Sequence, residues 1–206
     1  MRQPDHKIYL ASKSPRRREL LRQIGVEFEL LLLRDRLPAG PEVREDVIPG
    51  ESALDYVNRV TNDKACFAQK TMLWRKLPIR PILAADTTVV LDGQILGKPA
   101  NPEEAAAMLR ALSGRTHQVL TSVAVRHQDD AWQITQSSDV TFADLSAPNI
   151  AVYCATSEPY DKAGGYAIQG LASLFITNIA GSYSGIMGLP LFETAQLLQQ
   201  AGLRIL

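Results

Sequence analysis

The sequence predicts an α/β fold, because short apolar runs typical of strands alternate with amphipathic stretches typical of helices. The chain opens with a strand at 8–11, a helix toward Gly25 and a second strand at 28–33. Ser14 suits the N-cap of that helix, and Pro15 follows at the first helical position, where its missing N–H costs nothing. With 46% hydrophobic residues among 206, the chain can bury a substantial core.

Residues 34–50 are charged and proline-punctuated, which predicts an exposed loop of a length that is often functional. Glu42, Glu45 and Asp46 lie in it. A second helix is expected to begin near Glu51 and Ser52. Its apolar stripe also carries Lys64; the stripe consists of Ala53, Val57, Val60 and Ala68.

The middle of the chain predicts a buried strand at 82–91 with Asp86 inside it. Asp92-Gly93 is typical of a two-residue hairpin turn, so 94–96 should pair with that strand. A helix should then begin at Asn101 and close at Gly114.

The last part of the chain predicts a hairpin, an ordered loop and three further elements. The expected ranges are strands at 117–125 and 132–142 joined at Asp129-Asp130, a helix at 148–155, a loop without strand or helix at 157–170, a strand at 174–179, a turn at Gly181-Ser182 and a helix at 190–201.

Composition narrows the function classes. The 22 basic residues equal the 22 acidic ones, so the long-range positive field of a nucleic-acid-binding protein is absent and any anion site must be local. The polar start and the lack of a long apolar run predict a cytoplasmic protein that is neither secreted nor inserted in a membrane. Cys66 and Cys154 have no CxxC neighbour and no zinc pattern, and we expect reduced, mostly buried thiols.

The cluster KSPRRR at 13–18 is a candidate phosphate receptor. A helix N-terminus offers free N–H groups and a positive dipole end, and arginine adds bidentate hydrogen bonds to phosphate oxygens. The same cluster could instead be a solvated basic face or a motif read by a partner.

Asp86 lies within apolar sequence, so its carboxylate needs a compensating partner. It could coordinate a metal, accept a proton from water, or cap the amides of Thr87 and Thr88. Lys64 is equally ambiguous, because a lysine on a packed stripe is more often snorkelling than catalytic.

Lys98 precedes Pro99, which favours an extended backbone that could aim the lysine inward. In the late loop at 157–170, charged and amide side chains flank Gly164-Gly165 and Gly170, which also fits a tight surface turn. Together the cations and carboxylates suit a polyphosphate with a divalent ion. The sequence has no P-loop, no GxGxxG and no GxSxG motif, so the common kinase, dinucleotide and serine hydrolase solutions are not supported.

In combination these motifs resemble the Maf family of nucleotide pyrophosphatases along nearly the whole chain. The matching segments are LASKSPRRRELL at 10–21, ADT at 85–87, GKP at 97–99, LSGRTH at 112–117, DKAGGYAIQG at 161–170 and GLP at 188–190.

The resemblance implies a single domain over 1–206 with an elongated inosine-triphosphatase-like fold, in which a central mixed sheet and two lobes flank a cleft. It also implies a homodimer, a divalent cation (Mg²⁺ or Mn²⁺) and a nucleoside triphosphate substrate. Asp86 would be the catalytic base, and Glu45 would hold the metal. Arg44 stands where the family often has an acid, so Asp46 is an alternative to Glu45. The substrate would be bound by Ser12, Ser14, Arg16, Arg17, Lys64, Thr87, Lys98 and Gln169.

The form of the late loop is similar to enzymes that act on dTTP and UTP, although Gly165 and Ala167 stand where Ala and Gly are usual. The resemblance associates substrate choice with Arg16, Thr87 and Gln169. The Gln169 amide could pair with a pyrimidine edge, but a flipped amide would also suit cytosine, and modified pyrimidines stay open.

The expected reaction is hydrolysis between the α and β phosphates, giving the monophosphate and pyrophosphate, with Asp86 taking a proton from the attacking water. One alternative is a non-catalytic nucleotide sensor that regulates cell division, a role also linked to the family. Another is a nucleic-acid-binding module, which the zero net charge disfavours.

Overall fold

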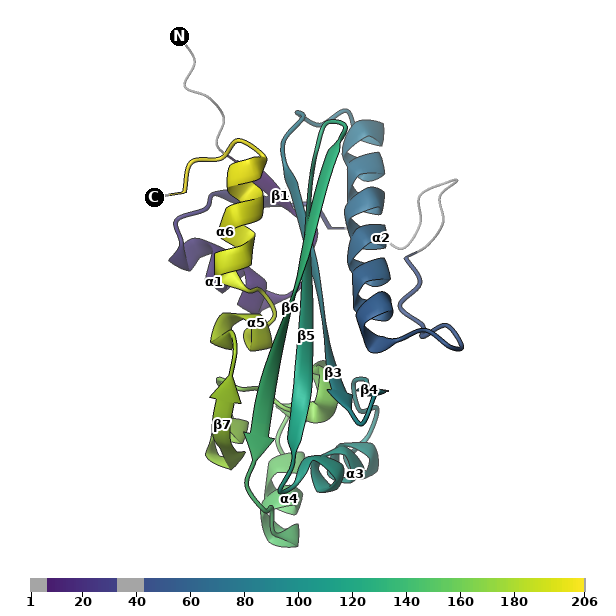
Figure 1. Cartoon of the computed structure of the whole chain (residues 1–206), viewed down its shortest axis with the longest axis vertical. Coiled ribbons are helices and arrows are strands. Elements are labelled where there is room, and N and C mark those ends of the chain that lie inside the picture. Colours follow the sequence, from purple (N-terminus) through teal and green to yellow (C-terminus); the bar gives the residue numbers. More distant parts are fainter. Residues whose placement is uncertain (1–6, 33–42, 206) are drawn as a thin grey trace.

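The protein is built on a long twisted sheet with helices on both faces (Figure 1). The computed structural model describes residues 7–32 and 43–205. The sheet has seven strands; six follow the order β2-β1-β3-β5-β6-β7, and β4 pairs with β3 outside this path. They are β1 (Ile8–Leu10), β2 (Phe28–Leu30), β3 (Ile82–Leu91), β4 (Gln94–Leu96), β5 (Thr116–His127), β6 (Asp130–Phe142) and β7 (Ile176–Ala180). β1 runs parallel to β2 and β3 and the other pairs are antiparallel, so the sheet is mixed.

Three of the helices begin next to a residue whose side chain caps them. The side chains of Ser14, Ser52 and Asn101 accept hydrogen bonds from main-chain N–H groups three residues later. The helices are α1 (Pro15–Gln23), α2 (Ala53–Trp74), α3 (Pro102–Leu112), α4 (Ala147–Cys154), α5 (Tyr183–Met187) and α6 (Leu191–Gln200). Short 3₁₀ turns are η1 (Pro159–Asp161), η2 (Ala163–Gly165) and η3 (Leu171–Phe175).

Several expected boundaries need correction. The strand expected at 174–179 begins at Ile176, because η3 occupies the preceding residues. The late loop is not free of helix, since it contains η1 and η2. α5 escaped prediction because five residues are too few for a helical periodicity. In the described part, β2 ends at Leu30, while Glu42 and the remainder of 33–42 lie outside the described residues.

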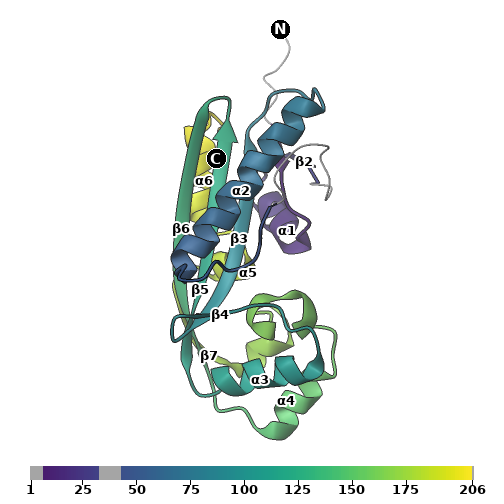
Figure 2. The same ribbon diagram turned by 90° about the vertical axis from the view of Figure 1, so that its right-hand side faces the viewer.

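The two faces of the upper sheet are covered by different helices, α2 on one face and α1 and α6 on the other (Figures 1 and 2). Strand alternation in β3 follows this division. Ile82 and Ala84 pack with α2, whereas Leu83 and Ala85 pack with α1 and α6. Continuing the period of two, Asp86 faces the side of α2 and Thr87 the side of α1.

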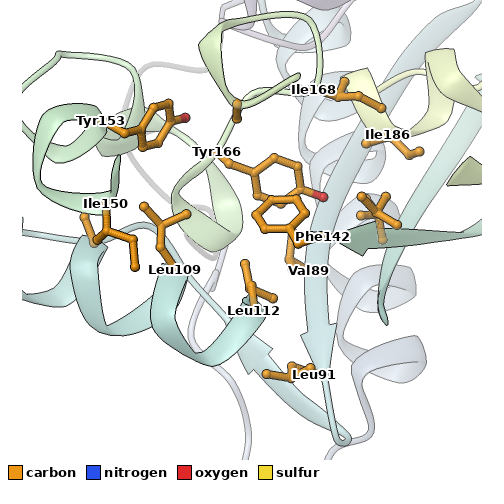
Figure 3. Packing of buried hydrophobic residues seen from close by; sticks show 14 of the residues in the cluster. Val89, Leu91, Leu109, Leu112, Phe142, Ile150, Tyr153, Tyr166, Ile168 and Ile186 are labelled. Atoms are coloured by element: carbon orange, nitrogen blue, oxygen red, sulfur yellow. The ribbon is translucent and has the colours of Figure 1, made fainter. Parts of the chain in front are cut away.

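The lower end of the molecule holds α3, α4 and the 3₁₀ turns around its own cluster of buried side chains (Figures 2 and 3). Phe142 and Tyr166 pack edge to face at its centre, with ring centroids 4.9 Å apart. Val89 of β3 belongs to the same cluster, so β3 connects the two ends of the molecule. Cys154 is buried here and Cys66 of α2 is half-buried, and both are free thiols.

One edge of β3 is interrupted in its middle. β5 pairs with β3 along its whole length on the other edge, from Ile82 to Val90. On the interrupted edge, β1 pairs with Ile82 and Leu83, and β4 pairs only from Val89 onward. Within the described residues no strand pairs with residues 84–88 there. The gap between β1 and β4 therefore opens beside Asp86 and Thr87.

Within the described part of the chain, none of the helices has both the length and the apolar character needed to cross a bilayer.

The packing of η2 on β3 can be tested with two matched glycines. Gly25 and Gly164 have nearly equal φ angles of +70° and +71°, but only Gly164 would place an added Cβ against a neighbour, 3.0 Å from the Val89 side chain. Gly25→Ala should cost the left-handed conformational penalty of about 1–2 kcal/mol. Gly164→Ala should lose about 1–3 kcal/mol more through overpacking, measured by urea denaturation. Equal losses in the two variants would contradict this packing.

Candidate active site

A cleft of about 1130 Å³ opens at the gap between β1 and β4. Its wall includes the loop between β1 and α1, the residues after β4, the late loop and part of the segment at 43–50, which carries Glu45 and is called the acidic loop. Every site residue predicted from the sequence lines it; these are Ser12, Ser14, Arg16, Arg17, Glu45, Lys64, Asp86, Thr87, Lys98 and Gln169. The fold thus gathers side chains that are up to 157 positions apart, from Ser12 to Gln169, in one hollow.

Lys64 lies between Asp86, the predicted catalytic base, and Glu45, the predicted metal ligand. Its Nζ donates to Asp86 Oδ1 at 2.7 Å and lies 2.9 Å from Glu45 Oε1. The side chains of Lys64 and Asp86 are each only 15% exposed, whereas that of Glu45 is 58% exposed. Lys64 is therefore not a snorkelling lysine. Asp86 uses an ammonium group as its partner, and no described main-chain amide is capped by it.

Glu45 is held as an anion by the cations around it. Burial alone would raise the pKa of Glu45, but the charge and hydrogen bond of Lys64 outweigh it, and Lys98 and Arg17 add to the effect, so the pKa lies below its ordinary value. Asp46, the alternative to Glu45, does not line the cleft. The geometry therefore favours Glu45 over Asp46 as the acid that faces a ligand.

Arg17 is fixed from three sides. Its Nε donates to the Gly188 carbonyl at 2.7 Å, Nη1 to Ser12 Oγ at 3.2 Å and Nη2 to Thr87 Oγ1 at 3.2 Å. Burial lowers its pKa, although the charge of Asp86 acts in the opposite direction. An arginine remains charged in either case, so a preorganised cation faces the acids across the cleft.

The hydroxyls near the start of α1 have different tasks. Ser14 Oγ accepts from the Arg17 N–H as the N-cap, at 3.4 Å. Ser12 Oγ accepts from the Ser14 N–H and from Arg17, which leaves its own proton available for a phosphate oxygen. Arg16 donates to the Met187 carbonyl at 3.3 Å and lies 4.0 Å from Asp161. Arg16 thereby connects α1 with α5 and the late loop.

The late loop is hydrogen-bonded to the segment that follows β4, and the Glu158 carboxylate binds the main chain just after the loop. The Gly164 N–H donates to the Gly97 carbonyl at 2.9 Å, next to Lys98. The Glu158 carboxylate accepts from the Leu171 and Ala172 N–H groups, and it lies so close to Gly170 that a Cβ there would be 2.3 Å from it. Gln169 precedes this tight point and is exposed to the cleft.

Apolar side chains also line the cleft, and a buried polar pair lies behind one of them. Val89, Tyr166 and Ile186 line it, and Figure 3 shows their side chains close together. His117 Nε2 lies 2.8 Å from Tyr166 Oη, behind the wall. The cleft therefore combines cations and acids with apolar wall residues, which suits a ligand that has both charged and apolar parts.

The comparisons with known proteins show the family of the chain. The family model for Maf-like proteins matches residues 7–201. The chain belongs to the Maf family. Three curated relatives are each named dTTP/UTP pyrophosphatase. The protein of Dechloromonas aromatica is 49% identical over 96% of this chain and 98% of its own length. Those of Nitrosospira multiformis and Aromatoleum aromaticum are 52% and 54% identical, covering 98% and 95% of this chain and 97% and 96% of theirs.

Among solved structures, the Staphylococcus aureus Ham1 protein is similar with a TM-score of 0.43 at 15% sequence identity, over 67% of this chain and 72% of that one. A likeness of this degree carries no argument, so the α/β class of this Maf family member rests on its own mixed sheet of seven strands and its helices.

Sequence reasoning missed the residues that support this site from behind. Tyr56 and Arg59 of α2 bind the main chain around Glu45, and the carbonyls of Met187 and Gly188 orient Arg16 and Arg17. Tyr56 lies eight positions before Lys64, which places both on one helical face and is the signal that could have found it. Main-chain acceptors leave no side-chain signal in a sequence.

The buried pair of His117 and Tyr166 predicts a pH effect on stability. His117 is 2% exposed, and burial lowers its pKa to about 4. In the unfolded chain a histidine titrates near pH 6.5, so between these values the unfolded state binds more protons. The contribution of neutral His117 to the free energy of unfolding is fully present above the pKa of the unfolded state. It is lost as the pH falls toward the pKa of the folded state, and the loss is at most about 3 kcal/mol.

His117→Gln should remove this component of the loss when the free energy of unfolding is measured by urea denaturation from pH 7 to pH 4. His127→Gln, at the far end of β5, serves as the control and should keep the wild-type dependence. The same pH dependence in His117→Gln and wild type would show that His117 is not buried in its neutral form.

Proposed function

We propose that this chain is a nucleoside triphosphate pyrophosphatase that hydrolyses dTTP and UTP to the monophosphate and pyrophosphate. The observation that carries the proposal is the Lys64 ammonium shared by Asp86 and Glu45, in the same cleft as the Arg17 guanidinium at the start of α1. The names of the curated Maf relatives support the same activity.

Asp86 is the proposed general base. Lys64 binds its Oδ1, and no described residue donates to Oδ2, so Oδ2 is the oxygen that can accept a proton from water. The water oxygen forms the new bond to the α-phosphorus while the bond to the oxygen bridging to the β-phosphorus breaks. Pyrophosphate then leaves with the electron pair of that bond. Arg17, Lys98 and the Ser12 hydroxyl hold the phosphates and offset the charge that develops on them.

The residues present fit a divalent cation that arrives with the substrate. Among the residues that the structure describes, no group of three or more His, Cys, Asp or Glu side chains could hold a metal. Mg²⁺ at nucleotide sites typically takes one or two carboxylates and completes its shell with phosphate oxygens and waters. Glu45, with Asp86 beside it, provides that smaller set. When bound, Mg²⁺ or Mn²⁺ would supply a Lewis acid for the phosphate charge.

Gln169 is the proposed reader of the base, because it is exposed to the cleft and the loop behind it is fixed by Glu158. Thr87 contributes in a different way. Its hydroxyl accepts from Arg17 and from Thr121, so Thr87 orients the guanidinium. Arg16 lies between α5 and the late loop, so its orientation depends on the position of that loop.

The setting of the enzyme is inferred from the composition of the sequence and from the family resemblance. A single two-lobed domain, a homodimer, a cytoplasmic location and a nucleotide as the sole class of ligand, without nucleic acid or membrane, stay predictions.

The activity is tested by incubating the purified protein with a panel of nucleoside triphosphates and Mg²⁺ or Mn²⁺. Pyrophosphate and orthophosphate are measured separately. We expect pyrophosphate from dTTP and UTP at rates well above those from purine triphosphates. Orthophosphate alone would contradict the proposed bond cleavage, and binding of nucleotide without any release would favour a nucleotide sensor.

Asp86→Asn tests the assigned base. The variant should bind nucleotide within a few-fold of wild type while kcat falls by about 10²–10⁴, the usual contribution of a general base. Asp129→Asn, at the tip of the β5–β6 hairpin, makes the same chemical change far from the cleft and should keep normal turnover. Near-normal kcat in Asp86→Asn would remove Asp86 from the mechanism.

A further inference from the structure

The acidic loop that carries Glu45 is bound to α2 through its main chain. Arg59 Nη1 donates to the Arg44 carbonyl and Nη2 to the Asp46 carbonyl, both at 2.9 Å. The hydroxyl of Tyr56 donates to the Glu45 carbonyl, also at 2.9 Å. Three successive carbonyls are thus held by two side chains that lie one helical turn apart.

We propose that Arg59 is a positioning residue that fixes Glu45 in the cleft by holding the main chain on both sides of it, with Tyr56 as its assistant and Glu51 as its anchor. This inference rests on the proposed function, in which Glu45 contributes to a metal site.

The anchor is a bidentate ion pair. Arg59 Nε and Nη2 donate to the two oxygens of Glu51 at 2.6 and 2.9 Å. The second carboxylate oxygen of Glu51 also accepts from the Ile48 N–H, at 3.2 Å. Glu51 therefore binds the guanidinium and the far end of the loop together. The bond to Arg59 is the main reason that the pKa of Glu51 lies below its ordinary value.

Tyr56 remains a donor at any relevant pH. Burial raises its pKa to about 12, and the charges of Asp86 and Glu45 act in the same direction. The Arg59 guanidinium also lies over the Tyr56 ring, 5.7 Å from its centroid. The two side chains that grip the loop therefore restrain each other.

One helix, α2, binds both the main chain around Glu45 and the Glu45 side chain. Tyr56 and Arg59 hold the main chain, and Lys64, further along α2, binds the carboxylate. If Lys64 alone held the acidic loop, the loop would move whenever the flexible Lys64 side chain changed its conformation. With the main chain fixed, the carboxylate stays at the cleft when Lys64 turns toward a phosphate.

The test compares Arg59→Lys with Arg75→Lys. Lysine keeps the positive charge, but its single ammonium group cannot form the bidentate pair with Glu51 and also donate to two main-chain carbonyls. Arg75 is the matched control, because it also donates to a loop carbonyl, that of Leu32 at 3.4 Å, beyond the other end of α2. The first readout is the Mn²⁺ concentration that half-saturates pyrophosphate release from dTTP. The second is hydrogen exchange of the amides at 43–50, measured without metal or nucleotide.

Arg59→Lys should raise the half-saturating Mn²⁺ concentration by about 10–100-fold, the usual cost of losing a residue that supports a metal ligand. The KM for dTTP at saturating Mn²⁺ should change less than twofold, and exchange at 43–50 should accelerate. Arg75→Lys should match wild type in both readouts. Tyr56→Phe removes a single hydroxyl and should change the Mn²⁺ requirement and the exchange rate in the same direction, by a smaller factor. This variant provides the test if Arg59→Lys fails to fold.

Two failures can be told apart. If wild type releases pyrophosphate and Arg59→Lys and Tyr56→Phe match Arg75→Lys in both readouts, the positioning role is wrong and the proposed function stands. If wild type hydrolyses no triphosphate, the proposed function fails, and the exchange measurement alone decides whether Arg59 and Tyr56 hold the loop.

Discussion

The site depends on the interruption of pairing along one edge of β3. β1 ends after pairing with Leu83 and β4 begins at Val89, so the strand segment between them borders open space. Strand alternation sends Asp86 to the side of α2 and Thr87 to the side of α1. The loops that leave β1 and β4 carry Ser12 and Lys98 into the same gap. One feature of the sheet thus explains why cations from distant segments meet an acid from the middle of the chain.

Within this gap, the charges depend on Lys64. Two carboxylates that lie close to each other repel, and a single ammonium between Asp86 and Glu45 offsets that repulsion. Arg17 is paired differently, because its donors are used by a carbonyl and two hydroxyls. Among the described residues no carboxylate forms a direct ion pair with Arg17, so its charge stays available to an anion. The cleft combines paired acids with a fixed cation, which suits a substrate that brings both phosphate and metal.

Much of this arrangement could be predicted from the sequence, and the exceptions have physical causes. Ser14, Asp92-Gly93 and Asn101 determine local structure through caps and turns, so the elements that they begin or join were found. The ten cleft residues were named largely through the resemblance to the Maf family. Arg59 and Tyr56 were missed because they act on main-chain carbonyls, which carry no side-chain pattern. α5 was missed because its short length gives no periodicity.

The most direct measurement of the central claim is a crystal structure with the α,β-imido analogue of dTTP and Mn²⁺, using anomalous scattering to locate the metal. The account predicts the triphosphate between the Arg17 end of α1 and Asp86, with Mn²⁺ coordinated by Glu45 and phosphate oxygens. A nucleotide bound outside this cleft, or a triphosphate whose α-phosphorus lies beyond reach of a water held by Asp86, would contradict it.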